Sequence, residues 1–201
     1  MSLSIDKSRK LQIFDLGGVL IEVDAKKTLS ELQALGFPAF DGVVSNSHAA
    51  GGIFTLYCNG LVTTDEFIAG LRSDFHISAT DEQLVNAWNA MLGDFIVPNI
   101  ETVRRLRSEG FTIALLSNCN ELHTVECRRR FTSRFNGDSF DDLFDSVFFS
   151  QEIHKSKPEL STWQLVLDHH KASPSDAAFY DDNDTNCLAA ASLGISAVQV
   201  L

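Results

Sequence analysis

Four apolar stretches of this 201-residue chain lead to polar or charged side chains whose types suit phosphoryl transfer. In chain order these side chains are Asp15, then Ser117 and Asn118, then Lys157, then Asp181 and Asp182. A carboxylate can attack phosphorus and form an acyl-phosphate, which divides one difficult step into two easier ones. Mg²⁺ held by carboxylates can neutralise the repulsion between two anions, and a lysine and a hydroxyl can hold the phosphoryl oxygens. The residue types therefore predict chemistry at a phosphate group.

These side chains converge only if the apolar runs before them are strands of one parallel sheet. From Pro98 onward, apolar runs alternate with helical periodicity, which predicts right-handed crossovers between parallel strands. The expected strands are residues 11–14, 111–116, 146–149, 177–180 and 195–200. The expected helices are residues 100–109, 121–131, 159–170 and 185–193. Ligands bind outside the carboxyl ends of such strands, so the polar side chains are expected along that rim.

Two of the expected helices begin next to these polar side chains. Asn118, with Glu121 three residues later, predicts a cap at the start of one helix, whose free N–H groups would form an anion site beside Ser117. Pro158 suits the first position of the other helix, which would place Lys157 at its amino-terminal end. Both helix starts would then face the same rim.

A mainly helical segment interrupts the sheet pattern after the first strand. It has no convincing strand between residues 24 and 93, and the expected helices are residues 28–35, 61–75 and 80–91. Thr63 and Glu66 form a plausible capping box for the second of them. We predict a Rossmann-like α/β core domain, residues 1–23 and 94–201, with helices on both faces of a parallel sheet. The remaining residues, 24–93, are expected to form a small all-helical cap domain inserted after the first strand.

The composition excludes several classes of partner. The formal net charge of −11 repels nucleic acid and anionic membranes. No stretch approaches the roughly 20 apolar residues of a membrane span, and the polar first ten residues do not resemble a signal peptide. The four cysteines show no CxxC spacing, which fits a reducing cytoplasm. We expect a cytoplasmic protein, a monomer or weak homodimer, whose partner is a small metabolite.

Taken together, the four motifs resemble those of the haloacid dehalogenase (HAD) superfamily, in the order of that family. The matching residues are Asp15, Ser117, Lys157-Pro158-Glu159 and Asp181-Asp182. The resemblance covers nearly the whole chain and looks closest to the bacterial branch typified by the α-D-glucose-1-phosphate phosphatase, which has a helical cap. Three stretches carry this finer likeness: residues 14–19, 116–123 and 179–183.

The resemblance implies a role for each matching residue. Asp15 would be the nucleophile, and Lys157 would pair with both the nucleophile and the phosphate. Asp15, the carbonyl of Gly17 and Asp182 would hold Mg²⁺, while Ser117, Asn118 and Lys157 would bind phosphate. The implied activity is that of a Mg²⁺-dependent phosphatase of a small phosphorylated metabolite. A sugar phosphate such as a hexose 1-phosphate is a candidate substrate, and the cap would select it.

One position departs from the usual pattern of the family. Most family phosphatases carry a second aspartate, the general acid and base, two residues after the nucleophile, where this chain has Gly17. The branch that this chain resembles also has glycine there, so activity is not excluded. Glu22, Asp24 or His123 would have to replace the missing acid, although a capping or packing role for His123 is the simpler interpretation.

Two rival functions follow from the same residues. A metal-independent 2-haloacid dehalogenase would use Asp15 as its nucleophile, but Asp181 and Asp182 would then only repel an anionic substrate. A non-catalytic protein that binds a phosphorylated metabolite, or a regulatory protein of the same fold, would explain Gly17. Phosphatase assays with and without Mg²⁺ distinguish these hypotheses.

Overall fold

A parallel sheet built from the most apolar runs of the chain forms the centre of the computed structural model, which describes residues 3–38 and 52–200. The strand order is β5-β4-β1-β6-β7, and every pairing is parallel. The strands are β1 (Leu11–Phe14), β4 (Thr112–Ser117), β5 (Ser146–Phe149), β6 (Ala177–Asp181) and β7 (Ser196–Gln199). All five predicted strands are confirmed, and β1 lies at the middle of the sheet.

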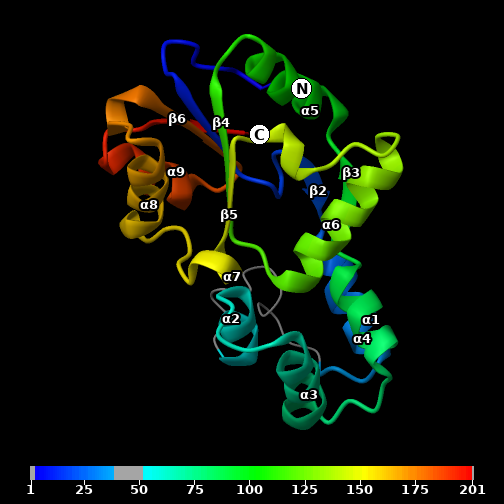
Figure 1. The fold of residues 1–201 in the computed structure, drawn as a ribbon. Helices are drawn as coiled ribbons and strands as arrows, with labels where there is room; N and C mark the ends of the chain where they lie inside the picture. Colours follow the sequence, from blue (N-terminus) through cyan, green and yellow to red (C-terminus); the bar gives the residue numbers. More distant parts are fainter. Residues whose placement is uncertain (1–2, 39–51, 201) are drawn as a thin grey trace.

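Helices cover both faces of this sheet (Figure 1). One face is packed by α5 (Val97–Ser108) and α6 (Glu121–Arg134), and the other by α8 (Leu160–His170) and α9 (Asp184–Ser192). Successive strand side chains point to opposite faces, so Ile13 and Phe14 enter two different apolar clusters. The predicted Rossmann-like α/β class is confirmed. In the described part of the chain, no helix combines the length and apolar character needed to cross a bilayer.

The predicted start of α6 (Glu121–Arg134) at Glu121 is confirmed, but the roles predicted for Asn118 and Pro158 at the two helix starts were wrong. Asn120, not Asn118, caps α6, because the cap must directly precede the first helical residue; its Oδ1 accepts from the His123 N–H at 3.1 Å. The Asn118 amide instead exchanges two hydrogen bonds with the Lys157 backbone, at 2.8 and 2.9 Å. The other helix, α8, starts two residues after Pro158, because the chain first makes a turn closed by the Glu159 N–H.

Four further helices form a separate layer below the carboxyl ends of the strands (Figure 1). They are α1 (Ala25–Ala34), α2 (Gly52–Cys58), α3 (Thr64–Phe75) and α4 (Asp81–Asn89). Phe54, Tyr57 and Trp88 lie in the apolar cluster that holds them together. The capping box of Thr63 and Glu66 is confirmed. The domain boundaries at residues 24 and 93 stay a prediction, and residues 39–51 of the expected cap lie outside the described part.

Several short elements were missed from the sequence. An antiparallel ribbon of β2 (Ile21–Val23) and β3 (Leu92–Phe95) carries the chain from the sheet to α1 and back from α4. Because β3 begins at Leu92, the expectation of no strand up to residue 93 was wrong at its end. Helices α2 and α7 (Ser150–Ile153) and the turns η1 (Asp141–Leu143) and η2 (Pro174–Asp176) were also missed. Elements this short give no clear periodicity.

The helical layer also touches the core at a second place, between α2 and α7. The Ser150 hydroxyl donates to the Cys58 carbonyl at 2.6 Å and accepts from the Cys119 N–H at 3.0 Å. Just after α2, Gly60 has a left-handed φ of 66°, and a Cβ there would overlap the Gln151 carbonyl oxygen. Glycine at this position is therefore required both by backbone conformation and by close packing.

We predict that Gly60→Ala destabilises the fold more than the same change at Gly36. Gly36 also has a left-handed φ, 100°, but a Cβ there would meet nothing within 4 Å. Gly36→Ala should therefore cost about 1 kcal/mol of unfolding free energy for the backbone conformation alone. Gly60→Ala should cost about 3 kcal/mol, because overpacking against Gln151 is added. Urea unfolding measures both values, and equal losses would contradict the close α2–α7 contact.

Candidate active site

A cavity of about 210 Å³ lies at the carboxyl ends of the strands. All six residues predicted for the site line it: Asp15, Gly17, Ser117, Asn118, Lys157 and Asp182. The opposite wall is less polar and includes Val23 from β2, Cys58 from α2, and Met91 and Leu92 near β3. The sheet thus supplies the charged floor, while the ribbon and the helical layer supply much of the wall.

Three carboxylates meet at the floor of this cavity. Asp15, Asp181 and Asp182 each place one oxygen within 4.8 Å of the others. Burial raises the pKa of Asp15 to about 6, although the Lys157 ammonium opposes this shift. Burial, and then the charge of Asp181, also raise the pKa of Asp182. Such a cluster of hard oxygen donors fits a Mg²⁺ ion, whose charge would relieve the repulsion between them.

Lys157 connects two of these carboxylates. Its Nζ atom lies 2.8 Å from Asp15 Oδ1 and 2.6 Å from Asp181 Oδ2, and its side chain is 1% exposed. Burial alone would lower the pKa of this lysine, but the two carboxylates outweigh it and raise the pKa above its ordinary value. Lys157 is therefore a permanent cation at the floor of the cavity, next to the carboxylate expected to react.

Asp181 holds Lys157 in place. It is fully buried, and besides Lys157 it accepts from the Asn183 N–H at 2.8 Å and from Asn186 Nδ2 at 3.1 and 3.2 Å. No role for Asp181 follows from the sequence alone, but these contacts assign it to supporting the lysine. Asn186 was missed from the sequence, where a lone asparagine in a helix carries no signal of its partner.

The two glycines after Asp15, Gly17 and Gly18, differ in whether the backbone requires glycine there. Gly18 has a left-handed φ of 68°, and a Cβ there would overlap the carboxylate of Asp182, so this glycine lets the chain pass close to that side chain. At Gly17 the φ is not left-handed, and a Cβ would meet only Val23 Cγ2 at 3.3 Å. Val23 is 44% exposed and can move aside. The backbone therefore does not require glycine at position 17.

Two of the suggested replacements for the missing acid do not reach the site. Neither Glu22 nor Asp24 belongs to the cavity lining in the described part of the chain. Asp24 instead caps α1 by accepting from the Lys26 N–H at 3.1 Å. Their chain position near Gly17 was the only signal for them. Glu22 alternates along β2 with Ile21 and Val23, which do line the cavity, and Asp24 is committed to the start of α1.

His123, the third suggested replacement, lines the cavity but is committed to packing. Its ring stacks on Trp88, with centroids 5.2 Å apart. Nδ1 accepts from Asn120 Nδ2 at 3.0 Å, and Nε2 donates to the Trp88 carbonyl at 3.1 Å, a pattern that requires the neutral ring. Burial lowers its pKa to about 4. At neutral pH its one ring N–H, on Nε2, is committed to the Trp88 carbonyl, so His123 has no proton available for a leaving group.

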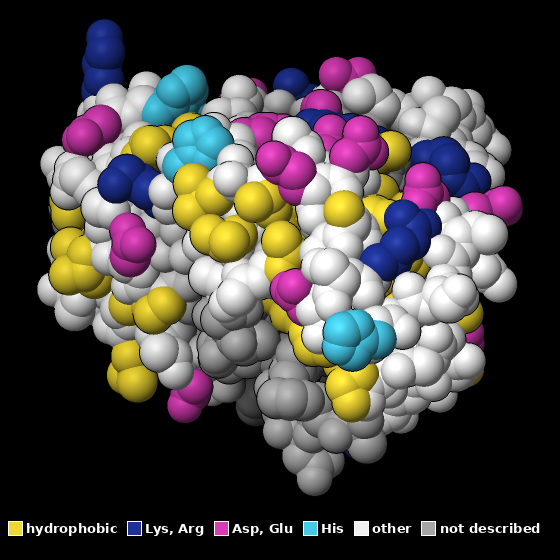
Figure 2. Space-filling model, turned by 90° about the horizontal axis from the view of Figure 1, so that it is seen from below, with side chains coloured by type: hydrophobic (Ala, Val, Ile, Leu, Met, Phe, Trp, Pro, Cys, Tyr) yellow, Lys and Arg dark blue, Asp and Glu magenta, His cyan; other side chains and the backbone are white. Residues whose placement is uncertain are grey.

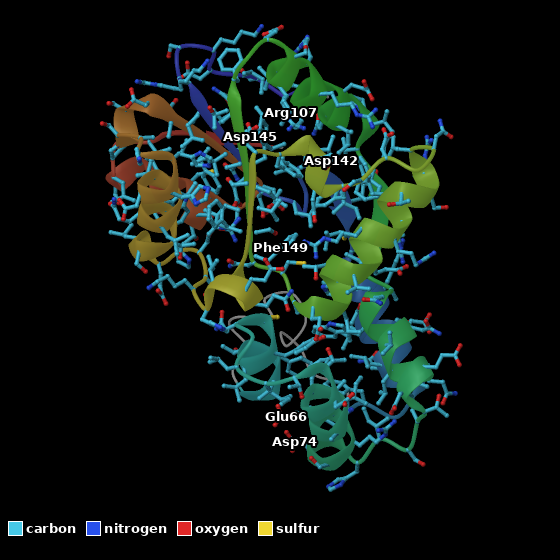
Figure 3. The ribbon with its side chains drawn as sticks, viewed as in Figure 1. Glu66, Asp74, Arg107, Asp142, Asp145 and Phe149 are labelled. Atoms are coloured by element: carbon cyan, nitrogen blue, oxygen red, sulfur yellow. The ribbon has the colours of Figure 1, made fainter. Side chains whose placement is uncertain are left out.

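A larger concave region lies far from this rim. It has a volume of about 420 Å³, over α5 and η1. Figure 3 labels Arg107, Asp142 and Asp145, which gather in this part of the molecule. Arg107 pairs with Asp145 at 3.8 Å, and the neighbouring Arg104 pairs with Asp138 at 2.7 Å. Because its charges neutralise one another, this region carries no reactive group comparable with the rim.

Charged side chains are dispersed over the outer surface near the helical layer. On the face shown in Figure 2, the lysines and arginines of the described residues stand apart among acidic and hydrophobic side chains. In the whole sequence, 27 acidic residues outnumber 16 lysines and arginines, which gives the formal net charge of −11. The concentrated charge of this protein lies instead in the buried cluster around Lys157.

We predict that His123 makes the protein less stable in acid. Its pKa of about 4 in the folded state lies below the ordinary 6.5, so the unfolded chain binds the extra proton first. The contribution of neutral His123 is complete above pH 6.5 and falls as the pH drops toward 4. The loss should reach about 3 kcal/mol.

Urea unfolding between pH 4 and 8 measures this loss. His123→Gln should flatten the acid side of the stability profile, because glutamine does not titrate. His169→Gln, at an exposed histidine of α8, is the matched control and should keep the wild-type profile. An unchanged acid limb in His123→Gln would show that another group causes the loss.

Comparison with known proteins agrees with this geometry. The chain is 26% identical over 188 residues to the D-ribitol-5-phosphate phosphatase of Bacteroides thetaiotaomicron, covering 93% of this chain and 89% of that protein. A HAD family enzyme of the same organism, solved as a magnesium complex, superposes with a TM-score of 0.85 at 30% identity, covering 96% of this chain and 93% of that one. Its complex with magnesium and inorganic phosphate gives a TM-score of 0.81 at 29% identity, covering 95% and 93%.

The match to a family model extends over most of the chain. The model describes a haloacid dehalogenase-like hydrolase, and it matches residues 10–194. That span includes every residue of the rim, from Asp15 directly after β1 to Asp182 directly after β6. The finer likeness to the glucose-1-phosphate phosphatase branch stays a prediction. The chain belongs to the haloacid dehalogenase-like hydrolase family.

Proposed function

We propose that this protein is a Mg²⁺-dependent phosphatase that hydrolyses a small phosphorylated metabolite through an aspartyl-phosphate on Asp15. The observation that carries the proposal is the buried contact of Asp15 with Lys157, 2.8 Å apart, at the floor of a small cavity. A carboxylate with a pKa of about 6 is largely ionised at neutral pH and is therefore in its nucleophilic form. The phosphatase relative and the magnesium and phosphate complexes of the similar structure support the same chemistry.

The reaction has two steps on this carboxylate. An Asp15 oxygen attacks phosphorus, the bond from phosphorus to the leaving-group oxygen breaks, and an aspartyl-phosphate forms. Water then attacks the same phosphorus, which releases inorganic phosphate and regenerates Asp15. Lys157, Ser117 and the main-chain N–H of Asn118 are proposed to bind the phosphoryl oxygens. The Asn118 side chain is not available for this contact, because it holds the Lys157 backbone.

Asp15, Asp182 and the Gly17 carbonyl are the proposed magnesium ligands. When bound, the ion would supply positive charge that neutralises the carboxylates and the substrate phosphate. Asp181 keeps Lys157 in position beside this site and is already occupied by hydrogen bonds. The chain therefore divides its acidic residues between ion binding and support of the lysine.

The substrate is proposed to be a small sugar or polyol monophosphate. The cavity of about 210 Å³ favours a small leaving group, and a relative acts on D-ribitol 5-phosphate. A hexose 1-phosphate remains a candidate, since its hemiacetal oxygen leaves more easily than a simple alkoxide. Residues 24–93 are the proposed cap, because α2 and the segment near β3 supply the wall opposite the phosphate.

We predict that Asp15→Asn abolishes phosphatase activity. The amide is nearly isosteric but a poor nucleophile, so turnover should fall at least about a thousandfold while the fold is retained. Asp74→Asn, the same change on α3 far from the cavity (Figure 3), should leave turnover unchanged. Residual activity of Asp15→Asn within tenfold of wild type would refute the aspartyl-phosphate.

The metal requirement separates the rivals in the same assay. A chelator should stop phosphate release, and added Mg²⁺ should restore it. Halide release from a 2-haloacid in chelator, without phosphate release, would establish the dehalogenase. Phosphate binding without any turnover would establish the non-catalytic binding protein.

We predict that the rate depends steeply on the leaving group, because the described residues place no acid at Gly17. A positioned proton donor typically contributes about 10²–10⁴-fold, so aryl and hemiacetal phosphates should be hydrolysed much faster than alkyl phosphates. Gly17→Asp should flatten this dependence, since only Val23 stands near the added Cβ. Gly17→Asn controls for bulk without an acid. A flat dependence in the wild type would mean that a donor is already present.

A further inference from the structure

The Asn120 side chain links the candidate site to α2 and α4, two helices of the helical layer. It lines the cavity and is 2% exposed. Its Oδ1 accepts from Trp88 Nε1 on α4 at 3.2 Å, and its Nδ2 lies 3.9 Å from Cys58 Sγ on α2, within range of a weak hydrogen bond. The same amide exchanges hydrogen bonds with His123, one turn into α6. One buried amide therefore joins α2, α4 and α6.

Trp88 is the partner through which this link extends into the helical layer. It is 1% exposed, and its ring stacks on His123 on one side and on Phe54 of α2 on the other, with centroids 5.2 and 5.6 Å apart. Its carbonyl accepts from both His123 Nε2 and Thr28 Oγ1. Any movement of α4 away from the sheet must therefore break the contacts with Asn120 and His123.

The same asparagine stands beside the proposed phosphate contacts. Ser117, Asn118 and Cys119 line the cavity immediately before it. A phosphate held by this loop would order the segment whose last residue is Asn120. Ordering of this segment would also restrain α2 and α4, because the Asn120 amide contacts one residue on each of these helices.

We propose that Asn120 is a positioning residue that couples phosphate in the site to the seating of α2 and α4 over it. This inference rests on the proposed function, since it requires that the cavity bind phosphate. Asn120 acts through Trp88 and Cys58 rather than on the reacting atoms. The coupling is reciprocal: phosphate seats the helices, and seated helices bind phosphate more tightly. A residue that only capped α6 would stabilise the fold equally with and without phosphate.

Trp88 itself provides the readout. The sequence has two tryptophans, Trp88 and Trp163, and the second packs on the far face of the sheet against Phe179. In a Trp163→Phe background, we expect inorganic phosphate with Mg²⁺ to change the Trp88 emission, with the same midpoint as binding measured by equilibrium dialysis. Asn120→Ala should weaken phosphate binding about tenfold and remove the emission change even at saturation.

Thr28→Val is the matched control. It removes a buried hydroxyl that donates to the same Trp88 carbonyl and accepts from the backbone N–H of Met91 in the cavity wall, but among the described residues it has no hydrogen bond with α6. We expect it to lower the melting temperature yet keep both the phosphate affinity and the emission change. This result would separate coupling from a general loss of stability.

A second variant covers the case in which Asn120→Ala does not fold. Trp88→Phe keeps an aromatic ring against His123 and removes the indole N–H that donates to Asn120 Oδ1, together with part of the buried indole ring. In wild type, phosphate should slow hydrogen exchange of the α2 and α4 amides, and in Trp88→Phe this protection should largely disappear. Full protection in Trp88→Phe would overturn the coupling.

The outcomes also separate this inference from the proposed function. If wild type binds no phosphate with Mg²⁺, the proposed function fails and the coupling fails with it. If phosphate binds, and Asn120→Ala retains the wild-type affinity and emission change, only the positioning role is overturned. If binding persists but the Trp88 response is lost in Asn120→Ala and kept in Thr28→Val, the coupling is supported.

Discussion

The buried ammonium of Lys157, held between Asp15 and Asp181, is the interaction on which the rest of the site depends. Carboxylates taken out of water in a chain of net charge −11 would otherwise protonate or move apart. The lysine lies within 2.8 Å of both carboxylates, so its charge offsets the repulsion between them. A charge pair this deep costs free energy to desolvate. The hydrogen bonds of Asp181 with Asn183 and Asn186 offset part of that cost, while Asp15 Oδ1 has the ion pair with Lys157 and no hydrogen bond among the described residues. Under the proposed function, the value of the pair lies in positioning the Asp15 carboxylate rather than in stability.

The fold maintains this charge cluster by fixing loops that are distant in the sequence. The Asn118 amide pairs with the Lys157 backbone, which joins the loop after β4 to the one that carries the lysine. Asn183 and Asn186 satisfy the carboxylate of Asp181 from the start of α9. Neutral amides serve here because they donate to carboxylates without adding charge. The Asp15 carboxylate, the proposed nucleophile, is thus supported by the segments that follow β4 and β5 and by the end of β6.

The wall of the cavity differs in chemistry from its charged floor. The side chains of the wall are largely aliphatic or sulfur-containing, and the histidine in it is held neutral by burial and by two directed hydrogen bonds. Gly17 leaves the position of the usual acid without a side chain, although the backbone there would accept one. Under the proposed function, the site would therefore bind the phosphoryl group electrostatically but supply no proton donor from position 17. It would then favour substrates whose leaving group departs without protonation.

The order and types of the motifs, the five core strands and the fold class followed from the sequence, because buried strands and their polar ends are local patterns. The rim residues met as expected, since parallel strands share one carboxyl edge. Tertiary structure alone decided that Asn118 braces Lys157 and that Asn120 contacts Trp88 and Cys58. Each of these side chains had several partners within reach of its chemistry, and only the packing of distant segments selected one.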